Sequence, residues 1–350
     1  MNVIKVSASR CYDVIVGTNL LKDLGHLVKQ VCKAQTIAIV SDSHVWPIYG
    51  ETVVNALSSA DFTCIHFVIE AGEQSKNGQN YLQLLEFLAQ NQITRSDCLL
   101  ALGGGVVGDL TGFAAATFLR GIDFIQVPTT LLACVDSSVG GKTAIDLEAG
   151  KNLVGAFYQP KLVVCDMDTL NTLPESIFLD GCAEVIKYGV LYDPELFSHL
   201  QEHGPAFDRE WVISRCISLK RDVVARDEFD RGERQKLNLG HTIAHGIEAS
   251  SNFAVSHGQA VAMGMAIISR WSAKAGVCSE ECKNSVVALI SKFKLPTKTD
   301  ATANSIYLHA LSDKKRSGGT VNLIVPEEIG RCKILPTPVN QLEGIIEAGL

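Results

Sequence analysis

The segment HTIAH carries two histidines that could share one metal ion. His241 and His245 are four residues apart, which places them on one face of a helix, and His257 follows in a later segment. Two histidines and one carboxylate can hold Zn²⁺ and leave a coordination position open for a substrate. Glu184 in GCAEVIKYG is a candidate carboxylate, for which an intrahelical ion pair with Lys187 is the alternative explanation. These residues predict a catalytic zinc site, and the spacing leaves open which two histidines bind.

A glycine cluster could bind a nucleotide. Residues 103–108 read GGGVVG, which fits G-x-G-x-x-G, follows a predicted strand and opens a predicted helix. Such a turn lets the backbone approach a pyrophosphate at a helix N-terminus, and the alternative is a tight strand-to-helix connection in the core. Polar side chains also follow predicted strands, where open α/β sheets bind ligands, and together they favour a nucleotide. They are Asp42, Glu73, Lys76, Thr129 and Thr130.

Several cationic side chains lie beside glycine or asparagine. The segment GGKT at residues 140–143 resembles the end of a P-loop, but the preceding VDSSV lacks the first glycine, which argues against ATP binding there. The phosphate of a small substrate is the better interpretation, and ordinary surface charge is the alternative. The cations and neighbouring amides are Lys142, Lys151, Asn152, Lys187, Lys220, Arg221, Arg234 and Asn238.

The elements that must position these residues change character along the chain. Strands alternating with helical segments predict a parallel sheet in the first half. Its apolar runs lie at residues 36–42, 63–72, 97–105, 123–131 and 162–168, with helical spacing at 80–92. After residue 172 helical spacing dominates, apart from strand-like alternation at residues 318–336.

Length and composition agree with this division. A chain of 350 residues accommodates two domains, each with its own core. We therefore predict an α/β domain at residues 1–172 and a mainly helical domain at residues 173–350, with the cleft between them as the default ligand site.

The composition also disfavours several classes of protein. With 31 Lys and Arg against 38 Asp and Glu, the net charge of −7 argues against a protein that mainly coats nucleic acid or an anionic membrane. The N-terminal segment lacks the features of a signal peptide, and we expect no membrane span. Eleven cysteines without a CxxC pair are typical of reduced thiols in a cytosolic protein.

The motifs resemble those of the 3-dehydroquinate synthases, within the sugar phosphate cyclase superfamily. Six segments occur in that family's order, namely GGGVVGDLTGFAAATFLRG, QVPTTLLACVDSSVGGKTAID, GKNLVGAFYQP, GCAEVIKYG, RQKLNLGHTIAHGIE and SHGQAVAMGM. The match runs from about Asp42 to Gly319. The resemblance implies a Rossmann-like NAD-binding N-terminal domain, a mostly helical metal-binding C-terminal domain and a cytoplasmic homodimer.

The resemblance also implies a role for each candidate residue. Glu184, His241 and His257 would bind Zn²⁺, for which Co²⁺ often substitutes, and His245 would lie beside the substrate. The implied NAD contacts are Asp42, Glu73, Lys76, Gly104, Gly105, Val106, Asp109, Thr129, Thr130, Lys142 and Lys151. The implied phosphate contacts are Lys142, Asn152, Lys187, Asn238, His245 and, from a second subunit, Arg120. Asp136 and Lys220 would contact hydroxyls, and Arg234 would bind a carboxylate with Lys314 or Lys315.

The implied reaction converts 3-deoxy-D-arabino-heptulosonate 7-phosphate into 3-dehydroquinate and phosphate. It is the second step of the shikimate pathway, which leads to chorismate and the aromatic amino acids. In the family, bound NAD⁺ transiently oxidises a hydroxyl that the metal polarises, phosphate is eliminated, the hydride returns and an intramolecular aldol closure follows. The resemblance therefore implies a carbon–oxygen lyase that uses NAD without consuming it.

Four alternatives compete with this function. Another sugar phosphate cyclase, making deoxy-scyllo-inosose or an epi-valiolone, would keep the NAD and metal residues, but Arg234 and the lysines of DKKRSGG favour a substrate with a carboxylate. A polyol dehydrogenase resembling glycerol dehydrogenase would offer the lysine cluster no phosphate. A catalytically silent module would lack a ligand or a phosphate-binding cation, and none is missing. A metalloprotease is disfavoured because Thr242 stands where HExxH has its glutamate.

Overall fold

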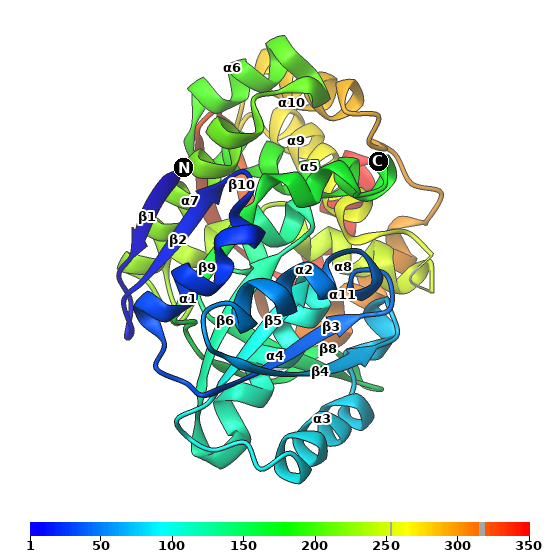
Figure 1. Cartoon of the computed structure of the whole chain (residues 1–350). Coiled ribbons are helices and arrows are strands. Elements are labelled where there is room, and N and C mark those ends of the chain that lie inside the picture. The colour runs from blue at the N-terminus through cyan, green and yellow to red at the C-terminus, as the bar shows by residue number, and fades with distance from the viewer. Residues whose placement is uncertain (253, 315–318) are drawn as a thin grey trace. The chain divides into compact units, whose positions relative to one another are not determined.

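Seven strands of one sheet organise the first half of the chain (Figure 1). The computed structural model describes residues 1–252, 254–314 and 319–350. The order across the sheet is β1-β2-β9-β6-β5-β3-β4, in which β1 pairs antiparallel with β2 and the other neighbours pair parallel. The strands are β1 (Asn2–Val6), β2 (Tyr12–Gly17), β3 (Thr36–Asp42), β4 (Thr63–Ile69), β5 (Cys98–Gly103), β6 (Asp123–Pro128) and β9 (Leu162–Asp166).

The central strands are apolar on both faces, and helices pack against both. Ile37 and Ile39 of β3 belong to one core cluster and Ala38 and Val40 to the other, as the two-residue period of a strand requires. The first cluster includes residues of α1 (Leu24–Val31) and α2 (Trp46–Ser58), and the second includes residues of α3 (Gly78–Gln90) and α4 (Gly105–Thr117). Each buried large aliphatic side chain contributes about 1.5–3 kcal/mol to stability.

Contacts divide the chain into two compact units. The first contains Met1–Pro174 and Arg209–Phe229, and the second contains Glu175–Asp208 and Asp230–Leu350. The first therefore includes α7 (Arg209–Arg226), which packs against β1 and β2, and a hairpin of β7 (Lys142–Leu147) and β8 (Gly150–Phe157). The sequence predicted one continuous boundary near residue 172. The structure differs because α7, which follows that boundary in the chain and buries Val212, Ile213 and Cys216, packs against strands of the first unit.

The second unit is mostly helical. Its central helix α9 (His257–Lys274) packs against α5, α8, α10 and α12. The other elements are α5 (Glu175–Tyr192), α6 (Pro194–His203), α8 (His241–Ser250), α10 (Glu280–Lys292), α11 (Ala303–Lys314) and α12 (Leu342–Gly349), with a hairpin of β10 (Thr320–Glu328) and β11 (Arg331–Pro338). An α/β unit and a mostly helical unit are the architecture that the sequence predicted.

Short helical segments connect these elements. They are η1 (Leu20–Asp23), η2 (Glu73–Ser75), η3 (Phe118–Arg120), η4 (Ala133–Ser137), η5 (Met167–Asn171), η6 (Gly204–Ala206), η7 (Glu233–Asn238) and η8 (Val339–Gln341). Of these, η4 is a single π-helical turn, a distortion that is frequent at functional sites. Four of them, η2, η3, η4 and η7, carry residues that the sequence analysis singled out.

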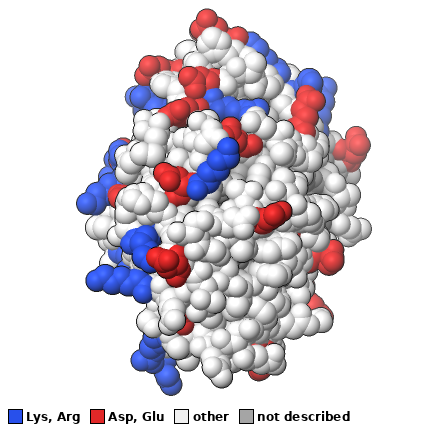
Figure 2. Space-filling model, viewed as in Figure 1, with Lys and Arg blue, Asp and Glu red and all other residues white. Residues whose placement is uncertain are grey.

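The helices were compared with the requirements of a membrane span, and charged side chains of both signs occur on the visible face (Figure 2). In the described residues, no helix is both long and apolar enough to cross a membrane. On the face shown in Figure 2, Lys and Arg side chains are interspersed with Asp and Glu.

Candidate functional site

Three side chains of the second unit converge as a set of metal ligands. Glu184 lies in α5, His241 is the first residue of α8 and His257 is the first residue of α9. The Nε2 atom of each histidine lies 3.3 Å from Glu184 Oε1. One ligand atom from each residue lies within 4.8 Å of the others. Such a set can bind Zn²⁺ or a similar divalent cation and leave a position open for a substrate.

Local structure fixes the two helix starts that carry the histidines. Gly240, just before His241, has a left-handed φ of 79°, and a Cβ there would lie only 2.9 Å from Val261 O of α9. Ser256, just before His257, forms a capping box with Gln259. Because α8 and α9 begin at these defined points and pack together, their first residues approach the same carboxylate.

The Glu184 carboxylate is fully buried and has incomplete hydrogen bonding. Lys187 Nζ pairs with Oε2, and the two histidines lie near Oε1, yet neither oxygen accepts a hydrogen bond within the described residues. The contacts are close enough for ion pairing, whereas a hydrogen bond also requires direction. Burial opposes ionisation of Glu184, but Lys187 and His241 outweigh burial and hold its pKa well below the usual range. A buried ionised carboxylate with unsatisfied oxygens beside two imidazoles fits a divalent cation.

The two histidines differ in protonation because their surroundings differ. Burial lowers the pKa of His241, which favours the neutral imidazole that binds metals. Burial opposes protonation of His257 too, but Glu184 and Glu248 outweigh it and raise the pKa of His257 to about 10. His257 Nδ1 lies 3.6 Å from Glu248 Oε1, so Glu248 can orient the ring while a cation replaces the proton on Nε2.

The structure separates His245 from the ligand set. His245 lies one turn after His241 on α8, with the ring centroids 5.9 Å apart, and does not belong to the group that could hold a metal. The ion pair that was the alternative explanation for Glu184 is present, and it involves the same carboxylate that the histidines approach. Lys187 is only 1% exposed, so its ammonium, paired with Glu184, lies in the interior beside the candidate metal ligands.

The remaining predicted residues of the second unit lie in η7 or outside the described side chains. Arg234 is buried and Asn238, at the end of η7, is exposed. Lys315 and the side chain of Lys314 lie outside what the structure describes. The choice between these two lysines therefore stays a prediction.

In the first unit, the predicted nucleotide contacts follow neighbouring parallel strands. The carboxyl ends of such strands meet at one edge of a sheet, where open α/β sheets bind ligands. Thr129 and Thr130 follow β6, Gly104, Gly105 and Val106 follow β5, Asp42 ends β3, and Glu73 and Lys76 follow β4. Gly104 is the N-cap of α4, so the free N–H groups of this helix start lie at the same edge.

Packing around the glycine turn leaves polar groups available to a ligand. A Cβ at Gly103 would lie 2.6 Å from Val107 Cγ2, so the turn from β5 into α4 requires glycine. Thr129 N–H donates to Gly103 O at 3.0 Å, while the buried Thr129 hydroxyl has no hydrogen-bond partner within the described residues. Asp42 Oδ1 accepts the N–H groups of His44 and Val45, both at 2.9 Å, which is the capping role weighed for it. An orphaned hydroxyl beside a helix N-terminus fits a nucleotide with polar groups.

Lys76 is buried among three carboxylates. Its Nζ lies 2.9 Å from Glu73 Oε1, 3.3 Å from Asp109 Oδ2 and 3.8 Å from Asp146 Oδ1. Burial opposes protonation of Lys76, but these carboxylates outweigh burial and raise its pKa. Burial raises the pKa of Asp109 to about 6, although Lys76 acts in the opposite direction. Lys76 also donates to Asn152 Oδ1 at 2.9 Å, which joins the predicted nucleotide contacts to a predicted phosphate contact.

Two further predicted contacts lie in the β7–β8 hairpin. Lys142 begins β7 and is exposed, and Lys151 lies in β8. Burial opposes ionisation of Glu73, but Lys76 and Lys151 together lower its pKa. Lys151 therefore acts on the same cluster of carboxylates as Lys76.

Asp136 and Lys220 form a pair within the first unit. Asp136 lies in η4 and pairs with Lys220 of α7, whose Nζ also donates to Asp136 O at 2.6 Å. Arg120, in contrast, is exposed at the end of η3 and has a left-handed φ of 68°, directly after Leu119 with a φ of 50°. Consecutive left-handed residues are strained, and strained turns persist where surrounding structure supports them.

Two residues beside the predicted sites escaped the sequence analysis. Glu248 lies seven residues after His241 on α8, so the helical period offered a signal for it. Asp146 contacts Lys76 and Asn152 from β7, and no motif or spacing distinguishes it from other acids in the chain.

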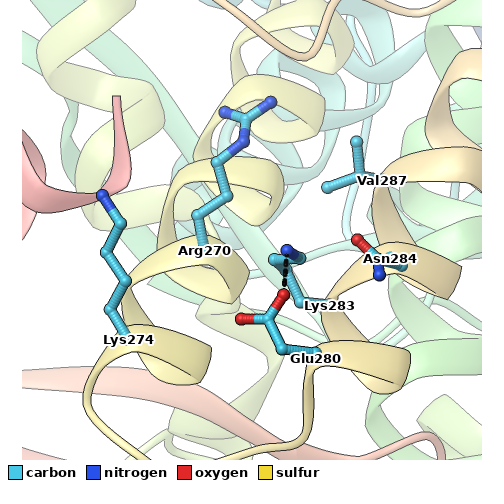
Figure 3. A pocket seen from close by; sticks show the side chains of 6 residues that line it. All are labelled: Arg270, Lys274, Glu280, Lys283, Asn284 and Val287. Carbon is cyan, nitrogen blue, oxygen red and sulfur yellow. Dashed lines mark hydrogen bonds and ion pairs between the residues drawn. The ribbon is translucent and has the colours of Figure 1, made fainter.

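A surface depression of about 230 Å³ lies between α9 and α10 (Figure 3). It is lined by Arg270, Lys274, Glu280, Lys283, Asn284 and Val287. Lys283 pairs with Glu280, while Lys274 donates to Ala348 O at 2.6 Å and Arg270 to Gly349 O at 3.4 Å. Arg270 and Lys274 therefore stabilise the C-terminal end of α12. None of the predicted site residues lines the depression.

Comparison with known sequences covers both units. Residues 66–180 match the family model described as 3-dehydroquinate synthase N-terminal, and residues 181–316 match the one described as 3-dehydroquinate synthase C-terminal. A 3-dehydroquinate synthase from Streptococcus suis (strain 05ZYH33) is 42% identical over 338 residues, which cover 95% of each chain.

Solved structures share the fold at lower identity. A 2-deoxy-scyllo-inosose synthase complexed with carbaglucose-6-phosphate, NAD⁺ and Co²⁺ has a TM-score of 0.90 at 24% identity, with all of both chains covered. A 2-epi-5-epi-valiolone synthase from Streptomyces hygroscopicus subsp. jinggangensis, with NAD⁺ and Zn²⁺ bound, has a TM-score of 0.88 at 24% identity and covers 99% of this chain and 98% of its own. These similarities confirm the predicted fold, and the sequence matches show that the chain belongs to the 3-dehydroquinate synthase family.

Proposed function

We propose that the protein is a 3-dehydroquinate synthase, which converts 3-deoxy-D-arabino-heptulosonate 7-phosphate into 3-dehydroquinate and phosphate. It would be a carbon–oxygen lyase of the shikimate pathway that acts as a homodimer in the cytoplasm. Family membership along most of the chain supports the reaction. The single observation that carries the chemistry is the buried Glu184 carboxylate, whose oxygens lack hydrogen bonds and which two histidines approach.

The cofactors would be NAD⁺ and Zn²⁺ or Co²⁺, which relatives of this fold contain. When bound, NAD⁺ supplies a reversible hydride acceptor and the divalent cation a Lewis acid that stabilises developing negative charge. Glu184, His241 and His257 would hold the cation. The residues that would hold NAD⁺ are Asp42, Glu73, Lys76, Gly104, Gly105, Val106, Asp109, Thr129, Thr130, Lys142 and Lys151.

Lys187 would recognise the phosphate together with other cations and amides. Lys187 lies in a low-dielectric interior, where a full positive charge attracts a phosphate more strongly than at the surface. Because Lys187 is already held by Glu184, its ammonium needs little reorganisation when the phosphate leaves. The proposed partners in this role are Lys142, Asn152, Asn238, His245 and, from a second subunit, Arg120.

The other ends of the substrate would meet paired polar groups. Lys220 holds Asp136 as an ion pair, so the pair offers both a donor and an acceptor to substrate hydroxyls. Arg234 is buried and always charged, and its planar guanidinium suits a carboxylate. A carboxylate distinguishes the heptulosonate from sugar phosphates that lack one, such as the carbaglucose-6-phosphate bound by a related cyclase, so Arg234 supports the 3-dehydroquinate synthase assignment.

Phosphate release from 3-deoxy-D-arabino-heptulosonate 7-phosphate tests the proposal. The assay contains trace NAD⁺ and Zn²⁺, with and without a chelator, and follows nicotinamide absorbance in parallel. We expect phosphate release that depends on the metal, with no net NADH because the hydride returns. Glu184→Gln should abolish turnover, while Glu148→Ala, which changes an exposed acid of the β7–β8 turn, should retain it.

Other outcomes of this assay would redirect the assignment. Net NADH from simple polyols would identify a dehydrogenase. Phosphate release from a hexose phosphate without a carboxylate, with none from the heptulosonate, would identify another cyclase. Chelator-insensitive turnover would contradict the metal assignment.

A further inference from the structure

Asp146 lies opposite an irregularity in the hairpin of β7 and β8. Ile145 pairs with Val154 and Leu147 with Gly150, so the extra residues lie in β8, and Asp146, which faces them, stands outside the regular ladder. Its N–H donates instead to Lys76 O at 2.8 Å, and it forms an isolated parallel bridge with Asn77. The backbone of Asp146 is therefore attached to the segment that carries Lys76.

The side chain of Asp146 connects that segment to the second strand of the hairpin. Asp146 Oδ1 accepts the N–H of Asn152 at 2.8 Å and lies 3.8 Å from Lys76 Nζ. Lys76 Nζ in turn donates to Asn152 Oδ1 at 2.9 Å, so the three residues form a closed ring. Asn152 has a left-handed φ of 56°, a conformation that the two hydrogen bonds of the ring stabilise.

Charge balance alone does not explain Asp146. Glu73 and Asp109 lie closer to the Lys76 ammonium than Asp146 does, and either of them can neutralise it. The side chains of Lys76 and Asp146 are 5% and 18% exposed, so salt screens their contact poorly. Asp146 belongs to neither proposed set of ligand contacts, but it touches Lys76 from the NAD⁺ set and Asn152 from the phosphate set. This position points to a geometric role.

We infer that Asp146 is a positioning residue that holds Lys76 and Asn152 as one unit and thereby couples NAD⁺ binding to phosphate recognition. The inference rests on the proposed function. A ligand that fixes Lys76 also fixes Asn152 through the ring, and linkage requires that phosphate improve NAD⁺ binding by the same factor.

Calorimetric titration of the Zn²⁺-loaded enzyme with NAD⁺, with and without saturating inorganic phosphate, measures this coupling. In the wild type we expect phosphate to lower the dissociation constant of NAD⁺ about fivefold or more. Asp146→Ala should reduce that factor to about one, because the ring is opened. Asp146→Asn keeps an oxygen for the Asn152 N–H and should restore part of the coupling. Glu148→Ala, in the same hairpin, is the matched control and should behave as the wild type.

Turnover and thermal unfolding separate positioning from general stability. Asp146→Ala should raise KM for the phosphorylated substrate more than it lowers kcat, and Asp146→Asn should recover part of KM. The inference would be overturned if phosphate improved NAD⁺ binding by the same factor in Asp146→Ala as in Glu148→Ala, whether or not the melting temperature of Asp146→Ala falls. A wild type that turns over the heptulosonate without coupling would overturn the inference alone, whereas one that binds neither NAD⁺ nor phosphate would overturn the proposed function as well. If Asp146→Ala does not fold, Asp146→Leu, which also lacks an oxygen for the Asn152 N–H, takes its place, and full coupling in that variant decides against the inference.

Discussion

Neutralising Glu184 should reveal how the buried charges of the second unit depend on one another. Glu184→Gln keeps the size of the side chain but leaves the ammonium of Lys187, which is 1% exposed, without this carboxylate. Loss of one partner of a buried ion pair costs about 3–5 kcal/mol, because the remaining charge is no longer compensated. We therefore expect Glu184→Gln to lower the free energy of unfolding of the metal-free protein by about 3–5 kcal/mol.

A second substitution isolates the cause of that loss. Lys187→Met removes the ammonium and keeps an unbranched side chain, and replacement of a whole buried ion pair by apolar groups is often neutral. Glu184→Gln/Lys187→Met should therefore recover most of the lost stability. Activity should not recover, because the double variant still lacks one of the three proposed metal ligands and the buried cation proposed for the phosphate.

Urea unfolding of the wild type, the two single variants and the double variant, each treated with a chelator, measures the four free energies of this double-mutant cycle. Phosphate release is measured on the same proteins loaded with Zn²⁺ and NAD⁺. The reasoning about charge is refuted if Glu184→Gln unfolds with the free energy of the wild type. It is also refuted if the double variant is less stable than both single variants. Metal-dependent turnover by Glu184→Gln would refute the assignment of Glu184 as a ligand.

Three further predictions concern the metal, a helix contact and pH. Zn²⁺ at about 100 times its dissociation constant should stabilise the protein by about 2.7 kcal/mol, and His257→Ala should remove this gain; a melting temperature insensitive to chelation would contradict it. Gly264→Ala places a Cβ 2.2 Å from Gly240 O, so it should destabilise the protein by about 1–3 kcal/mol and weaken metal binding through the adjacent His241. Gly344→Ala, whose Cβ meets nothing within 4 Å, is the control, and equal melting temperatures of the two variants would disprove the contact. The pKa of Asp109, about 6 against an ordinary 3.8, means that its contribution to stability is complete below pH 3.8 and is lost as the pH rises through 6. The free energy of unfolding of Asp109→Asn should therefore fall less over this interval, and pH profiles that coincide with the wild type would argue against the raised pKa.

Local patterns were sufficient to predict the elements that frame the site. Residues 36–42 were predicted as a strand and form β3 over the same residues, because a strand buried on both faces needs a continuous apolar run. The glycine cluster was predicted at a strand-to-helix junction, and it lies where β5 ends and α4 begins. Asp42 and Thr129 each follow a predicted strand. Because open α/β sheets bind ligands at the carboxyl ends of their parallel strands, both residues were predicted to lie at the ligand-binding edge of the sheet.

Spacing alone could not choose among the three histidines. The helical period relates His241 to His245, and the family resemblance, not the spacing, pointed to His257 in place of His245. In the structure, His257 approaches Glu184 because the starts of α8 and α9 are packed together, with Gly264 against Gly240 O.

The sequence by itself therefore determined the fold class, the order of the elements and the residue types available for chemistry. Only the tertiary structure decided that α7 belongs with the first unit, that Glu248 supports His257 and that Asp146 joins Lys76 to Asn152. Periodicity records which side chains share a strand or helix face. The contacts between elements depend on the packing of side chains far apart in the chain, which no local pattern records.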